Sequence, residues 1–286
     1  MTKRYLGNII TQNPTAPVGD FANSAAKGVW SLEEQLAYQK AGLWPVAGNF
    51  PLEVEDVFST YLYEGTGATL EINNGIDLDS EGGLVWAKRR DGNGDHWLVD
   101  TERGLDKSLK TNTTDANNTG SQQILSFDSD GFTLGNRNEG QNYNGLSFAS
   151  WTFRKAPKFF DVVTYTGDGV DNRTIAHNLG SVPGMIIVKA TSTADQWPVY
   201  HRSLGTGALR LNLTNAYNSA DIWWKTTPTD SAFTVYGGGE VNVSTVEYVA
   251  YLFAHNDGDG GFGPNGDDII KCGSFTTDGS GIATVD

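Results

Sequence analysis

Cysteine and histidine are scarce in this sequence, and long apolar runs are absent from it. Its 286 residues include one cysteine, Cys272, and four histidines. No internal disulfide can therefore form, and zinc sites built from cysteine and histidine have almost no ligands. No run approaches the about 18 apolar residues of a membrane-spanning helix, and residues 1–10 lack the apolar core of a signal peptide. We expect a protein without thiol redox chemistry or membrane insertion, soluble where it is made.

Basic residues are also in the minority. The chain has 34 acidic and 20 basic residues, which leaves a formal net charge of −14. The negative electrostatic field of such a chain repels phosphate backbones and anionic lipid headgroups. Nucleic acids and anionic membranes are therefore disfavoured as partners.

Glycine and asparagine are abundant, and aromatic residues are plentiful. The 35 glycines and 22 asparagines favour turns over helix interiors. Eight tryptophans, 11 tyrosines and 13 phenylalanines, within an apolar fraction of 38%, are enough to build hydrophobic cores. This composition predicts a globular, mainly β protein with many loops.

The chain repeats itself with a period of about 100 residues. With a shift of 100, seven of the 22 positions from 97 to 118 are identical to their counterparts, among them Trp97 with Trp197 and Asn112 with Asn212. With a shift of 101, Lys88 matches Lys189. Because the Lys and Trp pairs recur, we interpret them as residues with a shared structural role in both copies.

Short runs separated by Gly, Asn and Asp predict strands within each copy. Their number is typical of small antiparallel sandwiches, arranged either as two modules in tandem or merged into one larger jelly roll. An Asp-rich turn at residues 128–131 predicts a hairpin. The predicted strands are 84–88, 96–100, 123–127, 132–134 and 148–153 in the first copy, and 185–189, 199–201, 209–213, 233–236 and 248–253 in the second.

The period also divides the chain into segments. Residues 1–58 form an N-terminal anchoring segment, 59–160 the first sandwich repeat and 161–272 the second. Residues 273–286 begin a third copy, because the pattern at Tyr165 returns at Phe275. A single strand cannot bury its apolar face alone, so we expect this chain to be part of a longer product.

One short helix is predicted over residues 31–41. Ser31 and Glu34 form a capping box, and Gly42 stands where a left-handed C-cap is wanted. A helix this short needs a surface to pack on, either another chain or the first sandwich. The candidate anchoring contacts are Tyr5, Leu6, Ile9, Ile10, Trp30, Leu36 and Trp44.

Several sequence blocks can be compared with known proteins: KRYLGNII from residue 3, GVWSLEE from 28, GLWP from 42, DTERG from 100, SFDSDGFTL from 126, HNLGSVPG from 177, YVAYLFAHN from 248 and DIIKCG from 268. Together they resemble tail-fibre and tail-appendage proteins of marine bacteriophages, particularly those of cyanobacteria. The resemblance covers nearly the whole chain. It implies concanavalin-like or laminin-G-like sandwich modules in a virion protein made in the bacterial cytoplasm, often assembled into trimeric fibres. It offers no catalytic residue, cofactor or ligand.

Residues 75–81 carry the strongest hint of an enzyme. Concanavalin-like glycoside hydrolases aim two glutamates of a similar strand into the cleft, as nucleophile and acid. Here Asp77, Asp79 and Glu81 alternate on one predicted face, but Gly75 stands in place of the first glutamate. We therefore expect no hydrolysis.

Three other features have ordinary explanations beside functional ones. The Gly/Asp stretch 257–268 offers oxygen ligands for Ca²⁺ but lacks the EF-hand spacing, so a solvated loop is favoured. Trp223 and Trp224 point to opposite faces of a strand, one into the core and one toward an interface or a sugar. The scattered histidines, predicted in turns or on sheet surfaces, form neither a triad nor a metal site.

The expected function is that of a non-enzymatic virion structural protein, a tail fibre or appendage protomer that contributes to host adsorption. Its partners would be copies of itself, as a trimer, and other tail or capsid proteins bound through the N-terminal segment. The first alternative is a lectin-like module that binds glycans of the host surface. The second is a glycan hydrolase of the concanavalin-like class.

Overall fold

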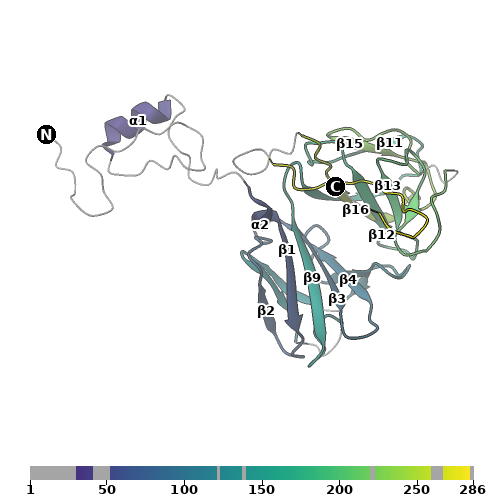
Figure 1. Ribbon diagram of the computed structural model, residues 1–286, viewed down its shortest axis with the longest axis horizontal. Coiled ribbons are helices and arrows are strands. Elements are labelled where there is room, and N and C mark those ends of the chain that lie inside the picture. Colours follow the sequence, from purple (N-terminus) through teal and green to yellow (C-terminus); the bar gives the residue numbers. More distant parts are fainter. Residues whose placement is uncertain are drawn as a thin grey trace. The chain divides into compact units, whose positions relative to one another are not determined.

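The structure, a computed structural model, describes residues 30–40, 52–120, 123–136, 140–219, 223–258 and 267–283. The chain divides into two compact units, of which the second, residues 54–260 and 268–286, contains the strands named below. The first unit contains helix α1 (Leu32–Lys40). The mainly β, antiparallel class predicted from composition is confirmed (Figure 1).

The first sandwich consists of a six-stranded and a three-stranded antiparallel sheet, preceded by the one-turn helix α2 (Val54–Val57). Figure 1 shows β1, β9, β3 and β4 side by side in the larger sheet. Its order is β1 (Phe58–Glu64), β9 (Ser147–Arg154), β3 (Gly83–Arg89), β4 (His96–Asp100), β5 (Lys107–Lys110) and β6 (Asn118–Thr119), and the smaller sheet has β2 (Leu70–Asn73), β8 (Gly131–Leu134) and β7 (Ile124–Asp128).

The second sandwich has the same strand order. An isolated bridge between Ala208 and Asn218 stands where β5 pairs with β6, and one between Trp224 and Val235 stands where β7 pairs with β8. Its larger sheet has β10 (Phe160–Thr166), β16 (Glu247–Phe253), β12 (Met185–Ala190), β13 (Pro198–His201) and β14 (Leu209–Arg210), and its smaller sheet has β11 (Arg173–Ala176) and β15 (Ala232–Val235).

Corresponding strands occupy corresponding places. Strands β3 and β12 are both third in their sheets, with Lys88 opposite Ala149 and Lys189 opposite Val249. Each sandwich has its own hydrophobic core between its two sheets. The two copies are therefore separate sandwiches in tandem, and the merged jelly roll is not formed.

The structure corrects the matching of Trp97 with Trp197. The backbone N–H of His96 donates to Asn112 Oδ1 at 2.9 Å, and that of Trp197 donates to Asn212 Oδ1 at 3.1 Å. His96 is thus the counterpart of Trp197, and the shift along this strand is 101. Since a one-residue slip moves a side chain to the opposite face of a strand, Trp97 and Trp197 point to opposite faces and have no shared role.

The predicted hairpin at residues 128–131 is confirmed. Asp128 pairs with Gly131 at the end of β7 and β8. Gly131 has a φ of +155°, and a Cβ there would lie 1.9 Å from the carbonyl oxygen of Ile72 on β2. Glycine is required because the two backbones approach each other too closely for a side chain.

Other local expectations had mixed outcomes. The capping box is confirmed, because Ser31 Oγ accepts the N–H of Glu34 at 3.2 Å and the Glu34 carboxylate accepts the N–H of Ser31 at 2.9 Å. The strand predicted at 209–213 ends at Arg210. No strand is assigned to the described residues 273–283, because no neighbouring strand pairs with them there. The first strand of each sandwich was not predicted.

A buried ion pair of the first sandwich is hydrogen-bonded to a tyrosine of the second. Arg103 Nε donates to Asp100 Oδ2 at 2.6 Å, and the hydroxyl of Tyr251 on β16 donates to the same oxygen at 2.6 Å. The guanidinium also donates to Asn117 Oδ1 at 2.7 Å. Burial is the largest single influence and lowers the pKa of Arg103, but Asp100 and Tyr251 together outweigh it, so the pKa is raised overall. All three members of the ion-pair network, Asp100, Arg103 and Tyr251, are buried.

Backbone atoms of the first sandwich cover Lys189 and Trp197 of the second. Lys189 Nζ donates to the carbonyl oxygen of Thr114 at 3.0 Å and to that of Asp195 at 2.9 Å. Trp197 Nε1 donates to the carbonyl oxygen of Thr113 at 2.9 Å. Burial lowers the pKa of Lys189 to about 8. The two sandwiches are therefore held by polar contacts that water does not reach.

We predict that Arg103→Met destabilises the protein by about 3–5 kcal/mol, because it leaves the carboxylate of Asp100 buried without a cation. Urea unfolding followed by tryptophan fluorescence measures the effect. The control is Lys271→Met, since Lys271 lies 3.8 Å from Asp257 in an exposed pair that contributes about 0–1 kcal/mol. A double variant with Asp100→Asn should recover part of the loss. Equal effects of Arg103→Met and the control would contradict the prediction.

A second prediction concerns pH. Between about pH 8 and 10.5 the unfolded chain keeps the Lys189 proton that the folded chain has released, so this group makes stability rise with pH. The stability of wild type relative to Lys189→Met should therefore increase by on the order of 1 kcal/mol from about pH 7 to about pH 9. Urea unfolding of both proteins at the two pH values measures it. A difference that stays constant or decreases is the contrary result.

Candidate functional site

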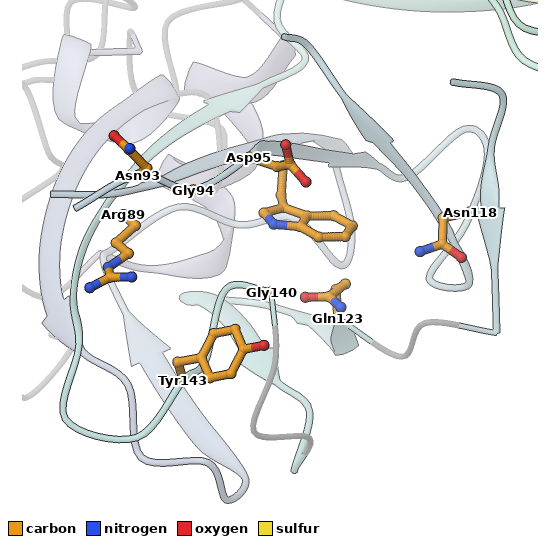
Figure 2. Close-up of a pocket in the computed structure, with 9 residues that line it drawn as sticks. Arg89, Asn93, Gly94, Asp95, Asn118, Gln123, Gly140 and Tyr143 are labelled. Atoms are coloured by element: carbon orange, nitrogen blue, oxygen red, sulfur yellow. The ribbon is translucent and has the colours of Figure 1, made fainter. Parts of the chain in front are cut away.

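A polar pocket of about 320 Å³ opens at one end of the first sandwich. It lies between the β3–β4 loop, β6, the start of β7 and the segment that follows β8. Figure 2 shows Arg89 and Tyr143 on one side and Asn118 on the other. The lining residues are Arg89, Asn93, Gly94, Asp95, Trp97, Asn118, Gln123, Gly140 and Tyr143.

Strand β4 positions the aromatic side of the pocket. Trp97 alternates with the core residue Val99, so its half-buried ring lies on the face that looks toward the smaller sheet. Lys110 Nζ lies 5.0 Å from the centroid of that ring and 2.8 Å from Asp95 Oδ2. The hydrogen bond from Lys110 lowers the pKa of Asp95, which keeps this carboxylate ionised.

The β3–β4 loop holds the basic side. Arg89 Nε donates to Asp91 Oδ1 at 2.6 Å, and Asp91 also accepts the backbone N–H of Ser147 at 2.9 Å. The hydrogen bond from Arg89 lowers the pKa of Asp91. A Cβ at Gly92 would lie 2.9 Å from the guanidinium. The loop therefore closes over Arg89 and fixes its direction.

Glycine and glutamine leave the middle of the pocket open. Gln123 Oε1 accepts the backbone N–H of Gln141 at 3.1 Å. Gly140 has a φ of +58°, and a Cβ there would lie 2.0 Å from the same oxygen. Any larger residue at 140 would displace the Gln123 amide.

The second sandwich fills the corresponding space. The bridge from Trp224 to Val235 matches the pairing of Ile124 with Leu134, so Trp223 takes the place of Gln123. Trp223 packs against the core and lies 6.2 Å from Tyr236, centroid to centroid. The fold itself therefore does not require the pocket, which depends on small and polar residues of the first sandwich.

The pocket has the composition of a binding site for a polar ring-shaped ligand. It combines two aromatic rings with amide, guanidinium and carboxylate groups, the mixture with which proteins orient such ligands. Asp95 is its one carboxylate, and it is paired with Lys110. Among the described residues, no cluster of three or more His, Cys, Asp or Glu could hold a metal ion.

The acidic residues 77–81 do not alternate along a strand. They lie in a loop, where Asp77 accepts both the N–H and the hydroxyl of Ser80, at 3.0 and 2.7 Å. Glu81 pairs with Arg154 at 3.0 Å. The expected alternation is wrong because Gly75 and Gly82, both at positive φ, turn the chain on either side.

The other sequence-predicted residues are spread over the molecule. Trp30 contacts the ring of Tyr38 edge-on at 5.4 Å, and Leu36 is 46% exposed. His177 is buried rather than on a surface, because it stacks on Phe233 at 6.5 Å. The candidate anchors Tyr5, Leu6, Ile9, Ile10 and Trp44, and residues 259–266 of the Gly/Asp stretch, lie outside the described residues.

Sequence reasoning missed the pocket. Its residues come from five separate places in the chain, and none of them forms a motif. The one signal in the sequence is that Gln123 stands where the second copy has Trp223. The two copies must be aligned in the correct register before this difference can be recognised.

Comparison with known proteins identifies one family. A family described as a domain of unknown function, DUF7483, matches residues 53–280. No curated protein and no solved structure matches the chain. Among the helices of the described residues, none is long and apolar enough to span a membrane.

Proposed function

This chain belongs to the DUF7483 family, and from its architecture and its sequence resemblance we propose that it is a non-enzymatic structural protein of a bacteriophage particle. It acts as a protomer of a tail fibre or similar appendage. Its N-terminal segment attaches it to the particle, and its sandwiches contribute to host adsorption.

The buried joint between the sandwiches is the observation that supports this proposal. The ion-pair network of Asp100, Arg103 and Tyr251 is buried in the joint. The hydroxyl of Tyr251 enters this network from the second sandwich, so opening the joint would leave buried polar atoms without a hydrogen-bond partner. A fibre that holds a receptor-binding end away from a particle needs stiff connections of this kind.

The acidic groups support the non-enzymatic part. A glycoside hydrolase needs two carboxyl groups about 5–10 Å apart on either side of the scissile bond. In the pocket, Asp95 is alone, and outside it Asp77 and Glu81 are bound to Ser80 and Arg154. No described pair flanks the pocket.

Locating the protein on intact particles tests the role. Antibodies against the sandwiches, with gold labels and electron microscopy, should mark tails or appendages, and the same antibodies should slow adsorption to host cells. Antibodies against an internal phage protein serve as the control. Particles that carry no label at any external structure would contradict the proposal.

A specific observation favours glycan binding as a second candidate function. The first sandwich keeps a pocket open where the second places Trp223. An open pocket with Trp97 and Tyr143 as aromatic walls offers an apolar face for a sugar ring and polar groups for its hydroxyls. Host surface glycans would be the ligands.

Gln123→Trp tests this candidate because it imitates the second sandwich and fills the pocket. On a glycan array, wild type should bind a defined set of neutral glycans, and Gln123→Trp should lose at least tenfold in affinity, about 1.4 kcal/mol. Tyr236→Ala, an exposed aromatic of the second sandwich, is the control and should bind normally. Binding that survives in Gln123→Trp would exclude the pocket. Cleavage of a bound glycan, lost in Asp77→Asn and Glu81→Gln, would overturn the non-enzymatic assignment.

A further inference from the structure

Each larger sheet has an outer face, defined as the side turned away from the smaller sheet of its own sandwich. In the first sandwich it carries Trp86, Lys88, His96 and Trp151, and in the second it carries their counterparts Ile187, Lys189, Trp197 and Tyr251. The two outer faces have matching positions but very different exposure.

The outer face of the second sandwich is covered. Its four residues Ile187, Lys189, Trp197 and Tyr251 are all buried, and Lys189 and Trp197 are 0% exposed. Residues 113–117 of the first sandwich provide much of this cover, as the contacts to Lys189 and Trp197 described above show. A backbone bond from Asn117 N to the carbonyl oxygen of Thr191, 2.9 Å, continues it.

The outer face of the first sandwich is not covered to the same extent. Trp86, Lys88, His96 and Trp151 are only half-buried, and Leu62 beside them is 57% exposed. The two indoles lie 6.5 Å apart, edge to face. Within the residues that the structure describes, Lys88 Nζ has no hydrogen-bond acceptor.

The second sandwich repeats the segment that provides the cover. Residues 211–217, which we call the docking loop, follow β14 as residues 111–117 follow β5. Thr214 and Asn212 are identical to Thr114 and Asn112. Leu211 and Leu213 of the docking loop are 38% and 42% exposed, although large apolar side chains are usually withdrawn from water.

We propose that the docking loop of a second copy of this chain binds the outer face of the first sandwich, so that copies join head to tail. Lys88 Nζ then donates to the carbonyl oxygen of Thr214, as Lys189 does to that of Thr114 within one chain. The His96 ring donates to the carbonyl oxygen of Leu213, in the role of Trp197.

The side chains that differ between the copies also match. Within the chain, the hydroxyl of Tyr251 meets the charged pair Asp100 and Arg103. The corresponding position of the first sandwich is Trp151, which offers no hydroxyl, and the docking loop presents leucines at 211 and 213 instead of the threonines at 111 and 113. The counterpart of Asp100 in the second sandwich is His201, so the contact between copies would bring no Asp–Arg pair to Trp151.

Such a contact is heterologous, because one surface patch binds a different patch of the next copy. Heterologous contacts close into rings or continue as filaments. Closure at three copies would produce the trimer that the sequence resemblance implies. The inference itself rests on the contacts within the chain and does not depend on the virion role.

Self-association of the full chain tests the proposal. Analytical ultracentrifugation from about 1 to 100 μM should show assemblies of more than one chain. Leu213→Asp in the docking loop and Lys88→Glu on the outer face should each weaken association at least tenfold, because each places a charge where the contact is dry. Val182→Asp, at an exposed position on neither surface, is the control and should associate like wild type.

Mixing the two variants distinguishes this contact from a symmetric one. Lys88→Glu keeps its docking loop and Leu213→Asp keeps its outer face, so one productive contact remains and the mixture should form dimers of two chains. Neither variant alone should dimerise. A contact between two copies of the same patch would leave one of the two variants associating alone, and that result would overturn the proposal.

Oxidative footprinting of the wild-type protein measures the protection of the outer face without any substitution. Protection of Trp86 and Trp151 should increase with protein concentration if a second copy covers them. Protection that does not change with concentration would assign the cover to this chain's own N-terminal segment and overturn the proposal. A chain that stays monomeric at about 100 μM would do the same.

Discussion

The buried pair of Asp100 and Arg103 is the constraint on which the arrangement of the two sandwiches depends. Removing two charges from water costs several kcal/mol per ion, and only good geometry and additional hydrogen bonds offset that cost. Here the hydroxyl of Tyr251 and the amide of Asn117 supply those bonds from both sides of the joint. A docking that placed Tyr251 elsewhere would remove its hydroxyl from Asp100 and Arg103, so the network favours this arrangement of the sandwiches.

The joint also explains why equivalent positions of the two copies have diverged. Lys189 and Trp197 are fully buried because the first sandwich covers them, whereas Lys88 and His96 remain half-buried. A residue in a contact without water needs a hydrogen-bond partner for each of its polar atoms. The indole N–H of Trp197 has one, a backbone carbonyl oxygen of the first sandwich. The pocket of the first sandwich and the corresponding space of the second also differ by one side chain, since Trp223 occupies the space that Gln123 leaves open.

Much of the fold could be predicted from the sequence, because alternating apolar residues and Asp–Gly turns mark central strands and hairpins. Strand β4 was placed at its observed bounds, His96–Asp100. The edge strand β1 was not predicted, because its residues do not show the full alternation of buried apolar and exposed polar side chains. Leu62, for example, is exposed. The pocket could not be predicted, because Trp97 matched Trp197 by identity alone. This alignment is wrong by one residue, which assigns the Trp97 side chain to the wrong face of its strand. Only the hydrogen-bond register of the strands reveals such an error.

Duplication therefore supplies two copies of each surface but not two identical environments. The contact within the chain uses residues 113–117 of the first sandwich and the outer face of the second, so the outer face of the first and the docking loop of the second take no part in it. In solenoids this asymmetry is met by polar capping modules. In this chain the outer face of the first sandwich is aromatic, with Trp86 and Trp151, and the docking loop of the second carries Leu211 and Leu213. Neither surface has the polar character of a cap, so the physical chemistry of both favours a contact with another sandwich.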